Sequence, residues 1–401
     1  MQKIIGYICT TLVILLVLAS CKSQKQLSKA IKPQVELDSL LQVAEDTFSI
    51  HSQPIQLPDT TDIEEVIILP TEPIKKDSII ITGVGDIMLG TNFPKSHYLP
   101  PNHGKNMLAQ VASQFTDADI VFGNLEGVLL DSGGTQKACK DPKICYLFRS
   151  PEYMGQRLKD ANFNLLSVAN NHGGDFGSVG RDNTGRVLDS LDIHFAGNLK
   201  QPFTLFEIAG TKYGFAAFSP NKGTPSINDI RNAKAVIAHL DSLADVVIVS
   251  FHGGAEGKNF TGVPRQHEYF YGEDRGDVYG FAHAMIDAGA DVIFGHGPHV
   301  PRAIEVYKNR FIAYSLGNFA TYARFNLQGV NGLAPIIKLI VDGEGKFLSG
   351  QIISAKQLGW GIPEIDQQNA ASKLIRDLTK KDIPEVKISI DESGFISYLH
   401  F

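Results

Sequence analysis

Apolar runs and segments with helical spacing alternate along the chain from Ser78 onward. The runs rich in β-branched and aromatic residues, as buried strands are, lie at Ile79–Val84, Ile120–Phe122, Leu165–Val168, Val246–Phe251 and Val292–Phe294. The helix-like segments between them lie at Asn106–Phe115, Glu152–Ala161, Arg181–Leu191, Ile230–Leu243 and Val278–Ala288. Alternation of this kind predicts parallel βαβ units.

The later part of the chain has a different pattern, which indicates hairpins. Strand-like runs lie at Tyr213–Phe218, Ala303–Tyr307, Phe311–Ser315, Ile336–Val341 and Phe347–Ser354. The residues 342–345, Asp-Gly-Glu-Gly, form a turn signal between the last two runs. The region 78–401 is large for one hydrophobic core. We therefore expect one α/β domain over 78–401, with two sheets that share a cover of helices.

The N-terminus predicts export. Lys3 precedes an almost unbroken apolar stretch, Ile4–Leu18. As a helix this stretch would be roughly 22 Å long, short of the ~30 Å hydrocarbon core of a bilayer. Residues 1–20 are therefore expected to be a signal peptide. The sequence Leu18-Ala19-Ser20-Cys21 resembles the lipobox of bacterial lipoproteins, which implies cleavage before Cys21 and acylation of its thiol. The alternative is a plain secretory signal with an incidental cysteine.

Residues 21–77 have the composition of a flexible tether. They are polar, with scattered prolines and no glycine, so they would link a lipid membrane to the folded domain. Lys22 stands where an acidic residue is linked to inner-membrane retention in some bacteria. We therefore expect a lipid-anchored protein of the cell envelope, on the periplasmic side of the outer membrane.

Cysteine usage and charge limit the class of protein further. Cys139 and Cys145 lie close together in a polar loop, and in an oxidising compartment such a pair is expected to form a disulfide. Half of a zinc site is the alternative, although no second pair of ligands lies nearby. The net charge of −6 and the lack of a long basic run argue against nucleic acid as a partner.

Polar residues end nearly every predicted strand. They lie in Gly85-Asp86, Gly123–Gly127, Asn170–His172, His252–Glu256 and Gly295–His299. In open α/β sheets ligands bind beyond the carboxyl ends of the strands, so five segments would meet at one crevice.

The mixture of these side chains predicts a metal. The oxygen and imidazole donors, with no thiolate among them, are Asp86, Glu126, Asn171, His252, His296 and His299. Such a set suits one or two divalent ions such as Zn, Mn or Fe. Gathering these groups without a cation would cost several kcal/mol or force large pKa shifts. For single residues other roles stay open: Asp86 would cap a turn, Asn171 would form an Asx-turn, and His252 would be a packed core histidine.

Six ordered motifs resemble those of the CapA (poly-γ-glutamate capsule synthesis) family over about residues 79–341. They are Gly85-Asp86-Ile-Met88, Gly123-Asn124-Leu-Glu126-Gly, Ala169-Asn-Asn171-His172, His252-x-Gly-x-Glu256, Gly295-His296-x-Pro-His299-Val and Tyr314-Ser-Leu-Gly-Asn318-Phe. That family is related to the calcineurin-like metallophosphoesterases. The resemblance therefore implies a metallophosphoesterase-like double β-sheet sandwich flanked by helices.

The resemblance also implies roles for single residues. Asp86, Asn171 and His252 would be metal ligands, Glu126 the bridging carboxylate, and His296 and His299 would each bind one metal. His172 would act as an acid or contact phosphate. Glu256 would serve as a base, bind substrate or pair with Arg265. Asn124 and Asn318 would bind substrate, although a turn at the rim of the cleft is the alternative for Asn318.

Three departures from the calcineurin-like metallophosphoesterases leave the chemistry open. Met88 stands where they have a histidine, the bridging residue is Glu126 rather than an aspartate, and the closing histidines lie three positions apart. The first hypothesis is a metal-dependent hydrolase or transferase, in which a metal-bound water attacks a phosphoester or a γ-glutamyl amide. The alternative is a non-catalytic accessory protein that binds, tethers or exports an anionic polymer together with capsule-assembly proteins.

Overall fold

The structure, a computed structural model, describes residues 76–139 and 145–399 of the chain. The predicted signal peptide (1–20), the acylated Cys21 and nearly all of the predicted tether (21–77) lie outside the described residues. Within the described part of the chain, no helix is long and apolar enough to cross a membrane.

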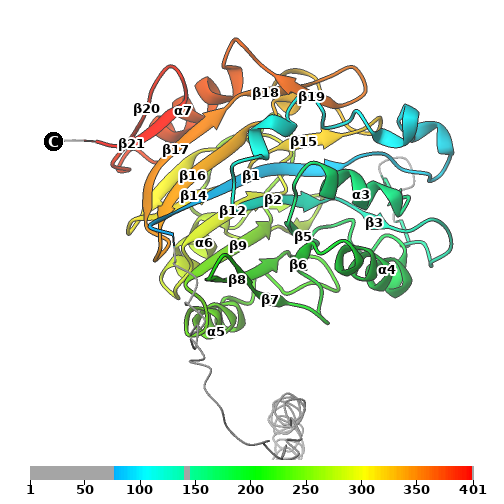
Figure 1. Cartoon of the computed structure of the whole chain (residues 1–401), viewed down its shortest axis with the longest axis horizontal. Helices are drawn as coiled ribbons and strands as arrows, with labels where there is room; N and C mark the ends of the chain where they lie inside the picture. The colour runs from blue at the N-terminus through cyan, green and yellow to red at the C-terminus, as the bar shows by residue number, and fades with distance from the viewer. Residues whose placement is uncertain (1–75, 140–144, 400–401) are drawn as a thin grey trace, which may run out of the picture. The chain divides into compact units, whose positions relative to one another are not determined.

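The larger sheet combines a parallel half with an antiparallel half (Figure 1). Its order is β20 (Ile388–Ile390), β21 (Phe395–Tyr398), β17 (Phe347–Ile353), β16 (Ile336–Asp342), β1 (Ser78–Met88), β2 (Ile120–Leu125), β5 (Leu165–Ser167) and β6 (His194–Ala196), and β15 (Asn318–Thr321) also pairs with β1. Strands β1, β2, β5 and β6 are parallel, as predicted. Strands β16 and β17 form the predicted hairpin, which turns at Asp342.

The smaller sheet has the same plan. Its order is β13 (Ile304–Tyr307), β14 (Arg310–Ala313), β12 (Val292–His296), β9 (Val246–His252), β8 (Thr211–Phe218) and β7 (Phe203–Ile208). The four inner strands are parallel, and the edge strands β13 and β7 pair antiparallel with their neighbours. Three two-stranded ladders complete the strands: β3 (Val128–Leu129) with β4 (Arg149–Ser150), β10 (Tyr269–Phe270) with β11 (Glu273–Asp274), and β18 (Ala355–Leu358) with β19 (Ile362–Ile365).

The two sheets pack face to face around one apolar layer. This layer takes side chains from both sheets, and the rings of Phe122 and Phe294 stack there with centroids 5.0 Å apart. Gly83 allows the close approach, because a Cβ at this position would lie 2.5 Å from the Phe294 ring. The double-sheet sandwich predicted from the sequence is therefore confirmed.

Helices cover the outer faces of the sheets and bury further apolar layers. The helices are α3 (Tyr153–Asp160), α4 (Gly177–Ser190), α5 (Ile230–Asp241), α6 (Val278–Ile286) and α7 (Ala370–Asp382). Side chains of α3 and α4 pack with residues of the larger sheet, and those of α5 and α6 pack on the smaller sheet. Short 3-10 turns lie at Ser96–Tyr98, Pro101–Gly104, Ala112–Phe115 and Gly329–Gly332.

One predicted helix is wrong. Residues 106–111 form successive turns, and only Ala112–Phe115 is helical, as a 3-10 turn. Hydrogen bonds such as Val111 N–H to Leu108 O close these turns over three residues. They bury Met107, Leu108, Val111 and Phe115. The apolar spacing that indicated a helix is thus satisfied by a tighter, irregular path.

Candidate metal centre

In each sheet the parallel strands end at a common edge, and these ends carry most of the predicted site residues. Asp86 lies near the end of β1, opposite Asn124 of β2 on one side and Asn318 of β15 on the other. In the smaller sheet His252 ends β9 and lies opposite His296, which ends β12. The pairing of β1 is irregular beside Asp86, and such irregularities redirect side chains.

A glycine makes the position of Asp86 attainable. The Asp86 N–H donates to Gly317 O at 2.9 Å, which draws two backbone segments together. A Cβ at Gly85 would lie only 2.0 Å from that same oxygen. Gly317 itself has a φ of +65°, a conformation that favours glycine.

Glu126, His252 and His299 form the cluster best suited to hold a metal ion. One ligand atom from each lies within 4.8 Å of the others, and Nδ1 of His252 lies 3.8 Å from Oε2 of Glu126. Both ring nitrogens of His252 are buried without a hydrogen-bond partner, and so is Oε1 of Glu126. Oδ1 of Asn171 is likewise buried and unpartnered. Because buried polar atoms are rarely left without partners, these residues fit a divalent cation.

The electrostatics differ among the three members of the cluster. Burial lowers the pKa of His252 well below its ordinary value, so its ring is neutral and has a lone pair for a cation. Burial and the nearby charge of Asp86 raise the pKa of Glu126 to about 8. Burial also opposes the charged form of His299, but a hydrogen bond and the charge of Asp86 raise its pKa to about 10.

Asn124 holds the two carboxylates of the centre together. Its Nδ2 donates to Oδ1 of Asp86 at 2.7 Å and to Oε2 of Glu126 at 2.8 Å, and its Oδ1 accepts from Asn170 Nδ2 at 3.1 Å. The side chain is fully buried. The structure therefore gives Asn124 a positioning role, which differs from the predicted contact with substrate.

Asn318 also positions a ligand rather than facing a substrate. It is buried, its Nδ2 donates to the backbone oxygen of His299 at 3.2 Å, and its Oδ1 lies 3.2 Å from Nδ1 of the same residue. His299 has a φ of +57°, a conformation that is strained for a residue with a Cβ. Asn318 and Asp86 together hold this strained residue in place.

His172 is oriented by a carboxylate that the sequence analysis missed. Its Nδ1 lies 2.7 Å from Oδ2 of Asp175, and its Nε2 lies 3.9 Å from Oε1 of Glu126. Burial lowers the pKa of His172, but the charge and hydrogen bond of Asp175 outweigh it and raise the pKa. Phe148 packs on the ring at 4.3 Å. The spacing of His172 and Asp175, three positions apart, was the available signal.

His296 does not join the cluster, so its predicted role as a metal ligand is not supported by its contacts. Its Nε2 lies 3.1 Å from the backbone oxygen of Val84, and its Nδ1 lies 3.5 Å from Oγ of Ser250. Its ring packs edge-on against Phe122 in the apolar layer between the sheets. Both nitrogens therefore have partners, and the ring bridges the two sheets.

Glu256 pairs with a different arginine from the one predicted. Nη1 of Arg275 lies 2.9 Å from Oε1 of Glu256, whereas Arg265 pairs with Glu385 at 2.5 Å. Arg275 is buried, and sequence reasoning gave no reason to select it. The charge of Glu256 acts on both Glu126 and His299, so this carboxylate lies beside the cluster.

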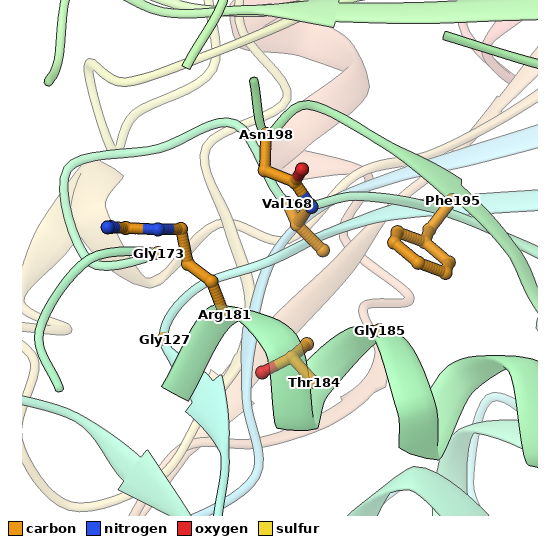
Figure 2. A pocket seen from close by; sticks show the side chains of 8 residues that line it. All are labelled: Gly127, Val168, Gly173, Arg181, Thr184, Gly185, Phe195 and Asn198. Carbon is orange, nitrogen blue, oxygen red and sulfur yellow. The ribbon is translucent and has the colours of Figure 1, made fainter. Parts of the chain in front are cut away.

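A small pocket is lined by none of the residues of the cluster. Figure 2 shows its lining, which consists of Gly127, Val168, Gly173, Arg181, Thr184, Gly185, Phe195 and Asn198. Gly127 and Gly173 directly follow Glu126 and His172 in the chain. Because the lining is mostly glycine and apolar side chains, the reactive groups are those of the cluster.

The predicted disulfide is present in the structure, and neither of its cysteines belongs to the cluster of Glu126, His252 and His299. Cys139 and Cys145 are joined in the structure, with their Cα atoms 5.9 Å apart.

Two facing sheets, with a buried cluster of carboxylates and imidazoles at their strand ends that is a candidate metal site, define an α/β protein of the double-sheet class. The likeness expected from the motifs is confirmed by comparison with known proteins. The chain belongs to the family described as "Bacterial capsule synthesis protein PGA_cap", which matches residues 80–323.

Curated relatives match a similar share of the chain. It is 30% identical over 274 residues to the "Capsule biosynthesis protein CapA" of Bacillus anthracis, covering 63% of this chain and 62% of that protein. It is 33% identical over 260 residues to the "PGA biosynthesis protein CapA" of Bacillus subtilis (strain 168), covering 61% and 63%. The chain thus spans less than two thirds of the length of each of these relatives.

Among solved structures, a 5'-nucleotidase precursor from Thermus thermophilus is 10% identical with a TM-score of 0.40, covering 77% of this chain and 59% of that one.

Proposed function

We propose that this protein is a metal-dependent hydrolase or transferase of capsule polymer metabolism, which acts on a phosphoester or a γ-glutamyl amide bond. One observation carries the proposal: His172 is oriented by Asp175 so that its Nε2 faces Oε1 of Glu126, 3.9 Å away, in the buried cluster. A histidine held in this way is suited to transfer a proton at Nε2.

The remaining residues of the site would bind the cation and orient His172. Glu126, His252 and His299 would hold a divalent cation, with Asp86 and Asn171 nearby. When bound, the cation would supply Lewis acidity and lower the pKa of water. Asp175 keeps Nδ1 of His172 engaged, so that Nε2 would deliver a proton to the leaving group.

A second candidate is a non-catalytic accessory protein that holds an anionic polymer. Two observations favour it. The buried Met88 offers only a thioether where the calcineurin-like metallophosphoesterases have a histidine, and both ring nitrogens of His296 are engaged elsewhere. A centre with so few free donors is suited to one ion, whereas many phosphoesterases use two.

Metal content tests the centre, and turnover separates the two candidates. We expect near-stoichiometric Zn or Mn in the purified protein by mass spectrometry, with the metal lost in Glu126→Ala and His252→Ala but kept in the surface control His239→Ala. A folded parent protein that takes up no metal contradicts the proposal.

With metal bound, His172→Asn should lower hydrolysis of a γ-linked oligoglutamate or a phosphodiester by about 10²- to 10⁴-fold. If the metal-loaded parent protein cleaves neither substrate, the accessory role replaces the enzymatic one.

We also propose that Cys21 anchors the chain to the cell envelope, on the periplasmic side of the outer membrane, where an anionic polymer and capsule-assembly proteins would be its partners. The lipobox-like sequence Leu18–Cys21 supports this placement. Labelled palmitate should enter the protein in cells and should be absent from Cys21→Ser. An unlabelled parent protein in the soluble fraction would rule out the anchor.

A further inference from the structure

Arg324 lies between two tyrosine rings at the edge of the metal centre. Its guanidinium carbon is 4.6 Å from the ring centroid of Tyr98 and 4.8 Å from that of Tyr146. Contacts with two aromatic faces fix the plane of a guanidinium and stabilise its charge. The side chain is thus held in one orientation before any ligand arrives.

This guanidinium has no acidic partner among residues 76–139 and 145–399. No ion pair or hydrogen bond of its side chain is found there, in contrast to two other arginines. Arg149 is also stacked, over Phe176, but its donors bond to Asn92 Oδ1 and Gly133 O. Arg302 is paired with Glu268. The five N–H donors of Arg324 therefore remain for a ligand.

Arg324 is next in the chain to a residue that packs against a member of the metal centre. The next residue, Phe325, lies edge-on to His299 with ring centroids 5.9 Å apart and stacks on Phe148 at 5.2 Å. The preceding residue, Ala323, has a φ of +73°, which is strained for a residue with a Cβ. A strained residue on one side and a packed aromatic ring on the other fix the position of Arg324 relative to the cluster.

A polar groove begins just beyond Phe325. It is lined by Lys258, Asn259, Asn326, Gln328, Gly329, Val330 and Asn331, with no acidic residue among them. One cationic residue and the lack of acidic ones make this lining compatible with a negatively charged ligand. Arg324 and the groove thus favour the same kind of ligand, although the protein as a whole has a net charge of −6.

We infer that Arg324, clamped by Tyr98 and Tyr146, binds a carboxylate group of the substrate at the rim of the metal centre. The planar fork of a guanidinium matches the two oxygens of a carboxylate. The inference deepens the proposed function and rests on it for the reaction that takes place beside the clamp.

Calorimetry on the full-length, Mn-loaded protein in detergent tests the clamp. The probes are a γ-linked pentaglutamate, the same peptide with amidated side carboxylates, and inorganic phosphate. The variants are Arg324→Gln, Arg324→Lys and the control Arg231→Gln, which removes an exposed charge on α5.

We expect Arg324→Gln to bind the pentaglutamate about 10- to 100-fold more weakly, the loss typical of a charge-assisted pair. Arg324→Lys should recover only part of this loss because an ammonium lacks the planar fork. The control should bind like the parent protein, and the amidated peptide should bind parent and Arg324→Gln equally weakly.

Three results would overturn the inference. The first is equal pentaglutamate affinity in Arg324→Gln and Arg231→Gln. The second is a parent protein that does not bind the pentaglutamate. The third is a loss in Arg324→Gln confined to phosphate, which would assign the site to phosphate. Metal content distinguishes failure of this inference from failure of the proposed function. If the protein holds no metal and its pentaglutamate binding still depends on Arg324, the proposed reaction is refuted and the clamp is kept.

Discussion

Nδ1 of His299 lies 2.8 Å from Oδ2 of Asp86, although the two residues are 213 positions apart in the chain. Asp86 belongs to β1 of the larger sheet, and His299 follows β12 of the smaller one. The contact therefore joins the two halves of the sandwich at the metal centre. Any change in the packing of the two sheets will alter the distance between the metal ligands.

Replacing Asn124 by alanine should weaken metal binding without removing a ligand. The substitution deletes the amide that bonds to both Asp86 and Glu126, so two buried carboxylates lose their shared donor. Loss of such a supporting contact typically costs 10- to 100-fold in metal affinity. Competition with a chelator measures the change, and Asn326→Ala, on an exposed amide, is the control. An unchanged affinity would show that Asn124 has no part in the centre.

Gly85→Ala should disturb both the fold and the centre. The added Cβ would lie 2.0 Å from Gly317 O and would push away the backbone that positions Asp86. We expect a loss of roughly 1–3 kcal/mol in the free energy of unfolding, together with weaker metal binding. Gly262→Ala, which meets only ordinary contacts, is the control. Denaturant unfolding and metal titration measure the two effects. The expectation would be contradicted if Gly85→Ala, like Gly262→Ala, matched the parent protein in both measurements.

The ion pair of Arg302 and Glu268 should be costly to break. Arg302 is fully buried, and its Nη1 and Nη2 donate to the Glu268 carboxylate at 2.7 and 2.8 Å. The same carboxylate accepts from Ala255 N–H, so the pair fixes the loop after His252. Arg302→Met should cost about 3–5 kcal/mol because Glu268 is left buried without a counter-charge.

The double variant Arg302→Met/Glu268→Leu provides the matched comparison. It removes both charges together and should be more stable than Arg302→Met alone. Urea unfolding measures both proteins. Equal stability of the single and double variants would show that the uncompensated charge is not the cause.

Asp366 should make α7 sensitive to acid. Its Oδ2 accepts from Ala370 N–H at 3.0 Å, and Lys356 Nζ lies 3.2 Å from its Oδ1. Burial opposes the charged form, but these bonds prevail and lower the pKa of Asp366 below its ordinary value of 3.8. The stabilisation is therefore present above pH 3.8 and is lost as the pH falls through the lower folded-state pKa.

Asp366→Ala should lower the free energy of unfolding by about 1 kcal/mol at pH 7, the usual contribution of a carboxylate at a helix N-terminus. The difference from the parent protein should shrink as the pH drops below about 4. Unfolding at pH 7 and pH 3 measures both values. A difference independent of pH would show that the charge of Asp366 contributes nothing.

Much of the centre was predictable because parallel strands end at a common edge. Asp86, Glu126 and His252 each follow a buried apolar run, so their polarity identified them as site residues. The orientation of a side chain was not predictable in the same way. His296 has the same sequence context as His252, but Val84 O and Ser250 of neighbouring strands engage its ring.

Long-range partners explain the other differences between sequence and structure. Asn124 and Asn318 were recognised as polar site residues, but only their contacts show that they hold ligands. Arg275 lies in a short hairpin region with no strong pattern, and its pairing with Glu256 depends on how two loops meet. The turns at 106–111 bury the residues that a helix would have buried. The spacing of apolar residues alone therefore does not distinguish a helix from this series of turns.

The disulfide between Cys139 and Cys145 ends one residue before Tyr146, which forms one side of the arginine clamp. Oxidation of these thiols therefore restrains the chain beside an aromatic ring that contacts Arg324. In a chain folded under reducing conditions, one side of the clamp would lose this restraint. At the cell envelope, the location proposed above, oxidation of this pair would thus act as a maturation step for ligand recognition.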